Sequence, residues 1–208
     1  MIASNHLITD TEKAMKLTVN INLAGYAFHL DEDAYLQLKE YLRQLEFEFS
    51  GEAGAAEIIA DIEGRMAELF AQRLHKYKQV IAMQDLDEVM VILGSPAAIS
   101  GNGDDDAGFR PAATRRFYRD PDGRIIGGVC AGIAAYVAWN PLIIRILFAL
   151  FILAGGFGLA LYLVLWVVLP EAVTTAQKLE MRGDPVTIAN ITRLVKSRFE
   201  TVKKKMKL

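Results

Sequence analysis

The chain has 208 residues, enough for one or two small domains, and its composition lies between those of soluble and membrane proteins, with 52% hydrophobic residues and a mean hydropathy of +0.22. The formal net charge of −2 conceals an asymmetry, because residues 1–109 carry 19 acidic and 8 basic side chains whereas residues 110–208 carry 6 acidic and 15 basic ones. This asymmetry indicates that the basic half contacts a membrane or another anionic partner. The single cysteine, Cys130, excludes an intramolecular disulfide.

The N-terminal stretch MIASNHLITDTEKAMK has neither a basic n-region nor an apolar h-region. A secretory signal is therefore not expected, and the segment that follows should stay in the cytoplasm. We expect residues 1–15 to be a disordered lead, and the sequence leaves open whether Met1 or Met15 is the start.

Residues 16–99 are predicted to form a small, acidic, soluble α+β domain with one β-hairpin and three helices. Apolar and polar residues alternate in Leu17–Leu23 and again in Tyr26–Leu30, and Ala24-Gly25 between them permits a turn. The alternation predicts two antiparallel strands, each with one buried face.

Three helices are expected after the hairpin. Apolar residues recur at helical spacing over about 31–49 and about 55–77. In QDLDEVMVILGSP, Asp85 and Glu88 have the spacing of a capping box, and Gly94 suits the helix end. A core of this size would gain stability from association with a partner.

The helix order and the ending VILGSP at 91–96 resemble HAAS domains, small helical signalling modules that accompany bacterial membrane sensors. An unrelated α/β module is the alternative. Residues 100–114, SGNGDDDAGFRPAAT, lack periodicity and are predicted to be a linker. Asp104–Asp106 in this linker lack the alternating ligands and closing Glu of a calcium loop.

Catalytic patterns are not found. His6, His29 and His75 lie in three different expected elements without metal-ligand spacing, and the sequence has no glycine-rich phosphate loop. The many carboxylates of the acidic half lie where exposed helix faces would place them. We therefore expect a protein that is not an enzyme, with no metal, no cofactor and no small-molecule substrate.

Residues 146–169 form an uncharged run of 24 positions, ILFALFILAGGFGLALYLVLWVVL. As one helix it would be about 36 Å long, enough to cross a hydrocarbon core of about 30 Å. The sequence predicts a transmembrane helix over about 142–169. Gly155-Gly156 also permits a kink or a re-entrant hairpin, which is less favoured because a lipid-exposed turn leaves backbone groups unpaired.

A shorter apolar segment, Ile125–Trp139, precedes that run and is rich in Gly and Ala. Gly128 and Gly132 are four residues apart, and Ala135 belongs to a neighbouring small-residue series. We predict that these residues form a close-packing face for another helix or a partner, and that Pro141 begins the next helix.

A family resemblance in this half rests on Arg115 to Arg119, Gly127 to Ala134, Tyr136, Pro141, Arg145, Tyr162, Leu165, Trp166 and Pro170. In this order they resemble the PspC domain family, over about residues 115–171, and the expected architecture here is all-α. The resemblance implies a bacterial inner-membrane protein of the envelope stress response that senses or signals. The acidic half resembles the N-terminal extension of PspC-like proteins of the Bacteroidetes type.

Two features depart from that family pattern. Asn140 stands where an acidic residue is expected before the proline. A β-rich extracytoplasmic domain does not follow, so a sensing or output part is expected to be missing or supplied by another chain.

Arg145 is the one charge inside the apolar region, and it either snorkels to the headgroups or pairs with a partner. The arginines that precede the uncharged run outnumber the basic residues just after it, which favours a cytoplasmic N-terminus.

Residues 172–208 are predicted to end in a basic amphipathic helix with one apolar face. That face comprises Ile188, Ile191, Val195, Phe199, Val202 and Met206. The helix can lie on anionic lipid through Lys203, Lys204 and Lys205, or dock on an acidic surface such as the N-terminal domain of a neighbouring chain. The charge also permits binding to nucleic acid, but this is not expected, because no recognition motif accompanies it.

Together these features predict a membrane-anchored regulatory protein of the envelope stress response in the bacterial inner membrane, with its N-terminal domain in the cytoplasm. The expected partners are membrane lipids, a cytoplasmic regulatory protein and another copy of the chain. The alternative is a structural membrane adaptor that scaffolds a complex without signalling. One crossing would put the tail outside the cytoplasm and a hairpin would keep it inside, and the sequence leaves this open.

Overall fold

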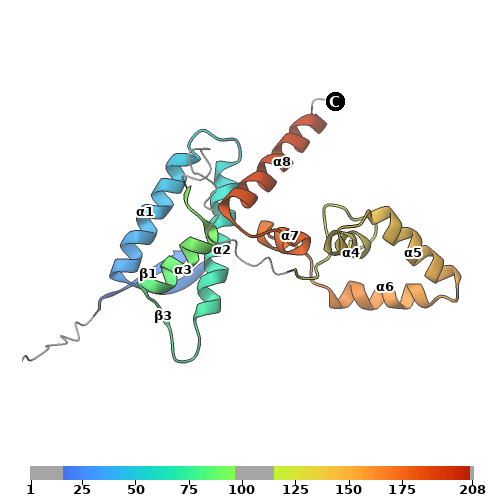
Figure 1. The fold of residues 1–208 in the computed structure, drawn as a ribbon, viewed down its shortest axis with the longest axis horizontal. Coiled ribbons are helices and arrows are strands. Elements are labelled where there is room, and N and C mark those ends of the chain that lie inside the picture. Colours follow the sequence, from blue (N-terminus) through green and yellow to red (C-terminus); the bar gives the residue numbers. More distant parts are fainter. Residues whose placement is uncertain (1–15, 97–114, 207–208) are drawn as a thin grey trace, which may run out of the picture.

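The structure is a computed structural model that describes residues 16–96 and 115–206 (Figure 1). The predicted disordered lead 1–15 and the predicted linker 100–114, with Asp104–Asp106, lie outside the described residues.

The described part of the chain begins with the predicted β-hairpin, which is confirmed. Strand β1 (Thr18–Leu23) pairs antiparallel with β2 (Tyr26–Asp31), and Val19 lies opposite Leu30. Ala24 and Gly25 both have positive φ, at 50° and 85°, which makes the tight turn. A third strand, β3 (Val80–Ile81), pairs parallel with β2. It was not predicted, because two residues are too few to show an alternation.

Three helices cover this sheet, as predicted, with two differences at their ends. They are α1 (Glu32–Glu48), α2 (Ala55–Arg73) and α3 (Met83–Leu93). Helix α2 ends before Tyr77, because His75 and Lys78 exchange two backbone hydrogen bonds and turn the chain toward β3. The capping box that begins at Asp85 is wrong: Asp85 lies inside the first turn of α3 and accepts a hydrogen bond from the Ala82 amide at 2.9 Å.

The tail contains two helices where one was expected, α7 (Thr175–Arg182) and α8 (Ile188–Met206). Thr174 and Gln177 form a capping box at the start of α7, and Gly183 with φ of 76° ends it. Helix α8 packs against α2, and its apolar residues Ile191 and Val195 are fully buried in one core with the N-terminal helices. The tail is therefore part of the N-terminal globule, which we call the head.

The remaining helices form an arm that projects from the head, with α7 between the two (Figure 1). They are α4 (Val129–Val137), α5 (Pro141–Leu153) and α6 (Phe157–Val168). The prediction of one transmembrane helix over about 142–169 is wrong. Gly155 and Gly156 have φ of 143° and 76°, which no α-helix accommodates, and the chain reverses there so that α5 and α6 pack together. Among the described residues, none of the helices combines the length and the apolar character that a bilayer crossing requires.

Candidate functional site

The turn between α5 and α6 closes with its backbone hydrogen-bonded. The Gly156 amide donates to the Ile152 carbonyl at 2.8 Å, and the Leu159 amide donates to the Gly156 carbonyl at 3.1 Å. Gly158 is buried, and a Cβ at this position would lie 2.7 Å from the Ile152 nitrogen, so only glycine allows the two helices to approach this closely. These hydrogen bonds pair part of the backbone at the turn. A turn at this place would therefore leave fewer unpaired backbone groups in lipid than expected from the sequence.

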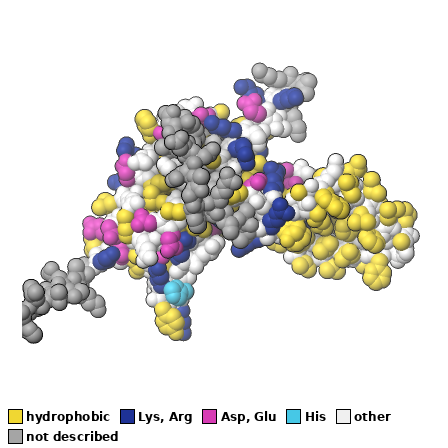
Figure 2. Space-filling model, in the orientation of Figure 1, with side chains coloured by type: hydrophobic (Ala, Val, Ile, Leu, Met, Phe, Trp, Pro, Cys, Tyr) yellow, Lys and Arg dark blue, Asp and Glu magenta, His cyan; other side chains and the backbone are white. Residues whose placement is uncertain are grey.

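The outer surface of this hairpin is apolar on all sides. Eight large apolar side chains are exposed on each of its helices: Leu142, Ile143, Ile146, Leu147, Leu150, Phe151, Ile152 and Leu153 on α5, and Phe157, Leu159, Leu161, Leu163, Val164, Trp166, Val167 and Val168 on α6. Figure 2 shows hydrophobic side chains over almost the whole visible face of the arm, while Lys and Arg gather where it meets the head. A soluble monomer rarely exposes a continuous apolar surface of this kind, which marks a membrane or protein contact.

The two tryptophans of the chain lie at the base of the hairpin. Trp139 is 56% exposed and precedes α5, and Trp166 is 44% exposed in the last turn of α6. Asn140 caps α5, accepting a hydrogen bond from the Leu142 amide at 2.9 Å, and Pro141 occupies the first helical position. The departure at Asn140 is therefore a helix cap, since Asn and Asp both serve in this place.

A neck at Arg119 joins the two ends of the arm. The Arg119 amide donates to the Pro170 carbonyl at 2.8 Å, and the Ala172 amide donates to the Arg119 carbonyl at 3.0 Å. Its guanidinium donates to the carbonyls of Leu169 at 2.9 Å and Gly127 at 3.2 Å. The arm therefore leaves and rejoins the rest of the protein at one place.

Comparison with protein families matches residues 115–172 to the PspC domain. The chain contains a PspC domain. Curated proteins and solved structures gave no match. The domain extends from just before Arg119 to just after Pro170, so it comprises the neck and the arm. PspC-domain proteins are typically membrane-associated and related to phage shock and envelope stress, and the family is not known for enzymatic activity.

The predicted close-packing residues of the PspC domain lie against an extended segment of the same chain. Gly128 has φ of 78° and caps α4, and a Cβ there would lie 2.5 Å from the Asp120 carbonyl oxygen. A Cβ on Gly132 would overlap the Tyr118 carbonyl oxygen, and Ala135 packs against the small cluster of Tyr118, Ala172 and Met181. These residues thus bring α4 onto the strand-like segment before it. Their role in contacting a partner helix stays a prediction.

Arg145 lies one turn into α5, near the base of the arm. Its guanidinium donates a hydrogen bond to the Gly123 carbonyl at 2.9 Å. This bond holds the loop before α4 against α5. Whether Arg145 also meets a partner stays a prediction.

The PspC domain is linked to the head through a buried polar cluster around Glu180 of α7. This carboxylate is 7% exposed and accepts hydrogen bonds from Arg65 of α2 at 3.0 Å and from the Tyr118 hydroxyl at 3.1 Å. Arg65 also pairs with Glu68 at 2.9 Å. Burial raises the pKa of Tyr118 above its ordinary value, so the hydroxyl stays protonated and donates.

A second polar contact joins the neck to both tail helices. Asp122 pairs with Lys178 of α7 at 2.7 Å and with Arg198 of α8 at 3.4 Å. Burial acts to raise the pKa of Asp122, but the hydrogen bond and positive charge of Lys178, with the charge of Arg198, hold it below its ordinary value. These links and the Arg119 neck were not predicted, because each joins residues that are far apart in the sequence.

The remaining predicted residues lie at the far end of α8. Lys203 and Lys204 are exposed there, and the side chain of Lys205 lies outside the described residues. The apolar face of the first half of α8 is occupied by the head, while Val202 and Met206 remain exposed. A membrane-surface role for the three lysines stays a prediction. In the described ranges, no three His, Cys, Asp or Glu side chains are grouped so that they could hold a metal ion.

Proposed function

We propose that this chain is a regulatory protein of the bacterial envelope stress response that inserts the α5–α6 hairpin into the cytoplasmic face of the inner membrane. The observation that carries the proposal is the apolar surface of the hairpin, with eight large side chains exposed on each helix. The PspC match at residues 115–172 supports the link to envelope stress.

The length of the hairpin fits insertion past the middle of the bilayer without crossing it. Helices α5 and α6 have 13 and 12 residues, so each is about 20 Å long. This is more than half of a hydrocarbon core of about 30 Å. Trp139 and Trp166 at the base have the place that aromatic residues favour, between the headgroups and the hydrocarbon.

The contacts of the tail support a location of head and tail on the same side. The neck at Arg119 brings both ends of the arm together, and α8 contributes Ile191 and Val195 to the core of the head. A tail that shares a core with the head cannot lie across a membrane from it. The excess of arginine before the arm favours the cytoplasm for both.

Cysteine labelling tests this topology. In a Cys130→Ala background, single cysteines replace Ser50 of the head, Ser197 of α8, or Ala154 at the tip of the hairpin. We expect an impermeant thiol reagent to label positions 50 and 197 in inverted membrane vesicles and neither position in intact cells. Position 154 should react only after detergent is added. Labelling of position 197 from outside the cell would contradict the proposal.

The head supplies a candidate contact for a cytoplasmic regulatory partner, and the same surface could join two copies of the chain. Exposed apolar side chains on α1, Leu36 at 59% and Phe47 at 73%, support such a contact. The alternative is an adaptor that scaffolds a complex without signalling. An envelope stress reporter in a deletion strain distinguishes the two, because only a regulator changes the transcriptional response when it is removed.

A further inference from the structure

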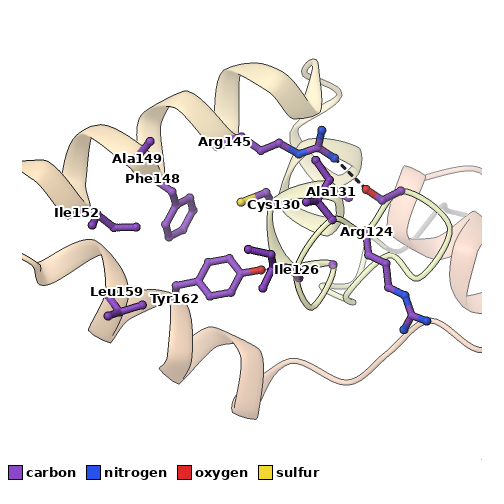
Figure 3. Close-up of a pocket in the computed structure, with 13 residues that line it drawn as sticks. Arg124, Ile126, Cys130, Ala131, Arg145, Phe148, Ala149, Ile152, Leu159 and Tyr162 are labelled. Atoms are coloured by element: carbon purple, nitrogen blue, oxygen red, sulfur yellow. Dashed lines mark hydrogen bonds between the residues drawn. The ribbon is translucent and has the colours of Figure 1, made fainter.

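A groove of about 320 Å³ lies between α5, α6 and the loop before α4 (Figure 3). Phe148 of α5 and Tyr162 of α6 meet edge to face in it, with ring centroids 5.7 Å apart. It extends from Arg145, near the base of α5, to Ile152, near its tip, a rise of about 10 Å along the helix. Apart from two arginines, its lining residues are apolar, glycine or Tyr162.

The two arginines lie at the end of the groove that is nearest the base of the arm. Arg124 is 61% exposed and approaches Glu171 at 3.9 Å. The Arg145 guanidinium donates to the Gly123 carbonyl, and in the described part of the chain no carboxylate forms an ion pair with it (Figure 3). A guanidinium has five N–H donors, so this hydrogen bond leaves donors for an anion.

We propose that the groove binds one acyl chain of an anionic glycerophospholipid, with the phosphate of that lipid against Arg145. The chemistry matches in both parts, because the apolar lining accepts a hydrocarbon chain and a guanidinium favours phosphate oxygens. The axis of the groove also runs from the base of the arm toward its tip, as a lipid chain runs from headgroup to bilayer centre. The inference rests on the proposed function, since lipid reaches the groove only when the arm is inserted.

A second copy of the arm fits the groove less well. Residues 125–169 contain no Asp or Glu, so the arm of another copy offers Arg145 no carboxylate. Glu171 at the neck already lies within 4 Å of Arg119 and Arg124. A lipid phosphate supplies the charge that another arm lacks.

Spin-label electron paramagnetic resonance on the full chain tests the inference. The protein is reconstituted into phosphatidylcholine vesicles that contain a trace of phosphatidylglycerol or phosphatidylcholine labelled near the end of one acyl chain. We expect the motionally restricted population to favour phosphatidylglycerol about fivefold, the ratio that a single basic residue near a membrane surface gives. Arg145→Gln should reduce the ratio toward one, whereas Arg43→Gln, which removes the same charge from the head, should leave it unchanged.

A second pair of variants tests the groove itself. Ala149 lines the groove on α5, and Ala160 is an exposed alanine of α6 outside it. Ala149→Phe should fill the groove and reduce the restricted population of both lipids, and Ala160→Phe should not. An equal preference for both lipids in the unmodified protein, or equal effects of the two Phe variants, would overturn the inference. Vesicle flotation separates the two levels: flotation without lipid preference leaves the proposed function standing, and absence of flotation overturns both.

Discussion

Glu180 links the three parts of the protein at the scale of single side chains. Its carboxylate is almost fully buried and contacts Arg65 of the head and Tyr118 of the PspC domain, while its backbone belongs to the tail helix α7. A buried carboxylate is tolerated only when charge and hydrogen bonds compensate it. Helix α2 of the head, the PspC domain and the tail helix α7 therefore depend on one another through this side chain.

Replacing Glu180 with Gln tests this dependence. The change removes the charge but keeps the shape, so Arg65 loses one of its two carboxylate partners. We expect a loss of about 1.5–3 kcal/mol of folding free energy, the usual contribution of hydrogen bonds to charged groups. Thermal unfolding in detergent micelles measures it. Glu200→Gln, on the exposed side of α8, is the matched control, and equal melting temperatures for the two variants would contradict the role of Glu180.

The Asp122 carboxylate gives a pH-dependent contact. Its pKa is lowered in the folded protein, so its contribution to stability is present above the ordinary value of 3.8 and is lost as the pH falls through the lowered value. The side chain is 56% exposed, which limits the effect to about 1 kcal/mol. Asp122→Asn should therefore melt below the unmodified protein at pH 6, and the difference should shrink as the pH falls below 3.8 and through the lowered pKa of Asp122. A difference independent of pH would show that the charge of Asp122 is not responsible.

At the scale of helices and strands, periodicity predicted the elements that pack locally. The alternation in β1 and β2 and the helical spacing in α1 gave the right element types, because each pattern reflects one buried face. The uncharged run at 146–169 gave one helix instead of two. Its hydropathy is the same in both arrangements, and the positive φ of Gly155 and Gly156 leaves no hydropathy signal.

The candidate site was predictable only in part for a related reason. The family resemblance of residues 115–171 located the PspC domain, and the family match over residues 115–172 confirms it. The amphipathic pattern of α8 predicted that one of its faces is buried. It did not predict that this face packs against the head of the same chain. Contacts such as Arg65 to Glu180 join residues 115 positions apart, which no local pattern reports. Gly158 was overlooked, although the GGFG sequence was a signal for a close turn.

Gly158 is the position at which the hairpin should be most sensitive to substitution. A side chain there would meet the backbone of Ile152 and the carbonyl carbon of Phe151, which lies 2.9 Å from the added Cβ. Gly158→Leu should force α5 and α6 apart, and limited proteolysis in micelles should then cut near the turn at least several times faster. Ala160→Leu adds similar bulk two residues later on an exposed position and should leave the cleavage rate unchanged. Unchanged cleavage of Gly158→Leu would contradict the tight hairpin.

At the scale of the whole molecule, the described residues form two larger hydrophobic cores and, between them, a small cluster of Tyr118, Ala172 and Met181. One contains the buried residues of α1, α2 and α3 together with those of α7 and α8. The other lies between α4, α5 and α6, around Ala134, Ile144 and Phe148. Because apolar side chains in one core unfold together, the tail should behave as part of the head, and the arm should respond separately to damage in the head.

Ile191→Asp in α8 tests this division. Ile191 is fully buried in the first core, so a carboxylate there should cost at least as much as the 2–5 kcal/mol that truncation of a core isoleucine costs. We expect amide hydrogen exchange in micelles to accelerate in α8 and also in α2, against which α8 packs, while α5 and α6 keep their protection. Thr201→Asp, on an exposed position of α8, introduces the same charge and should change little. Loss of protection in α8 alone would show that α8 unfolds independently of the head. Equal loss in α5 and α6 would show that head and arm unfold as one unit.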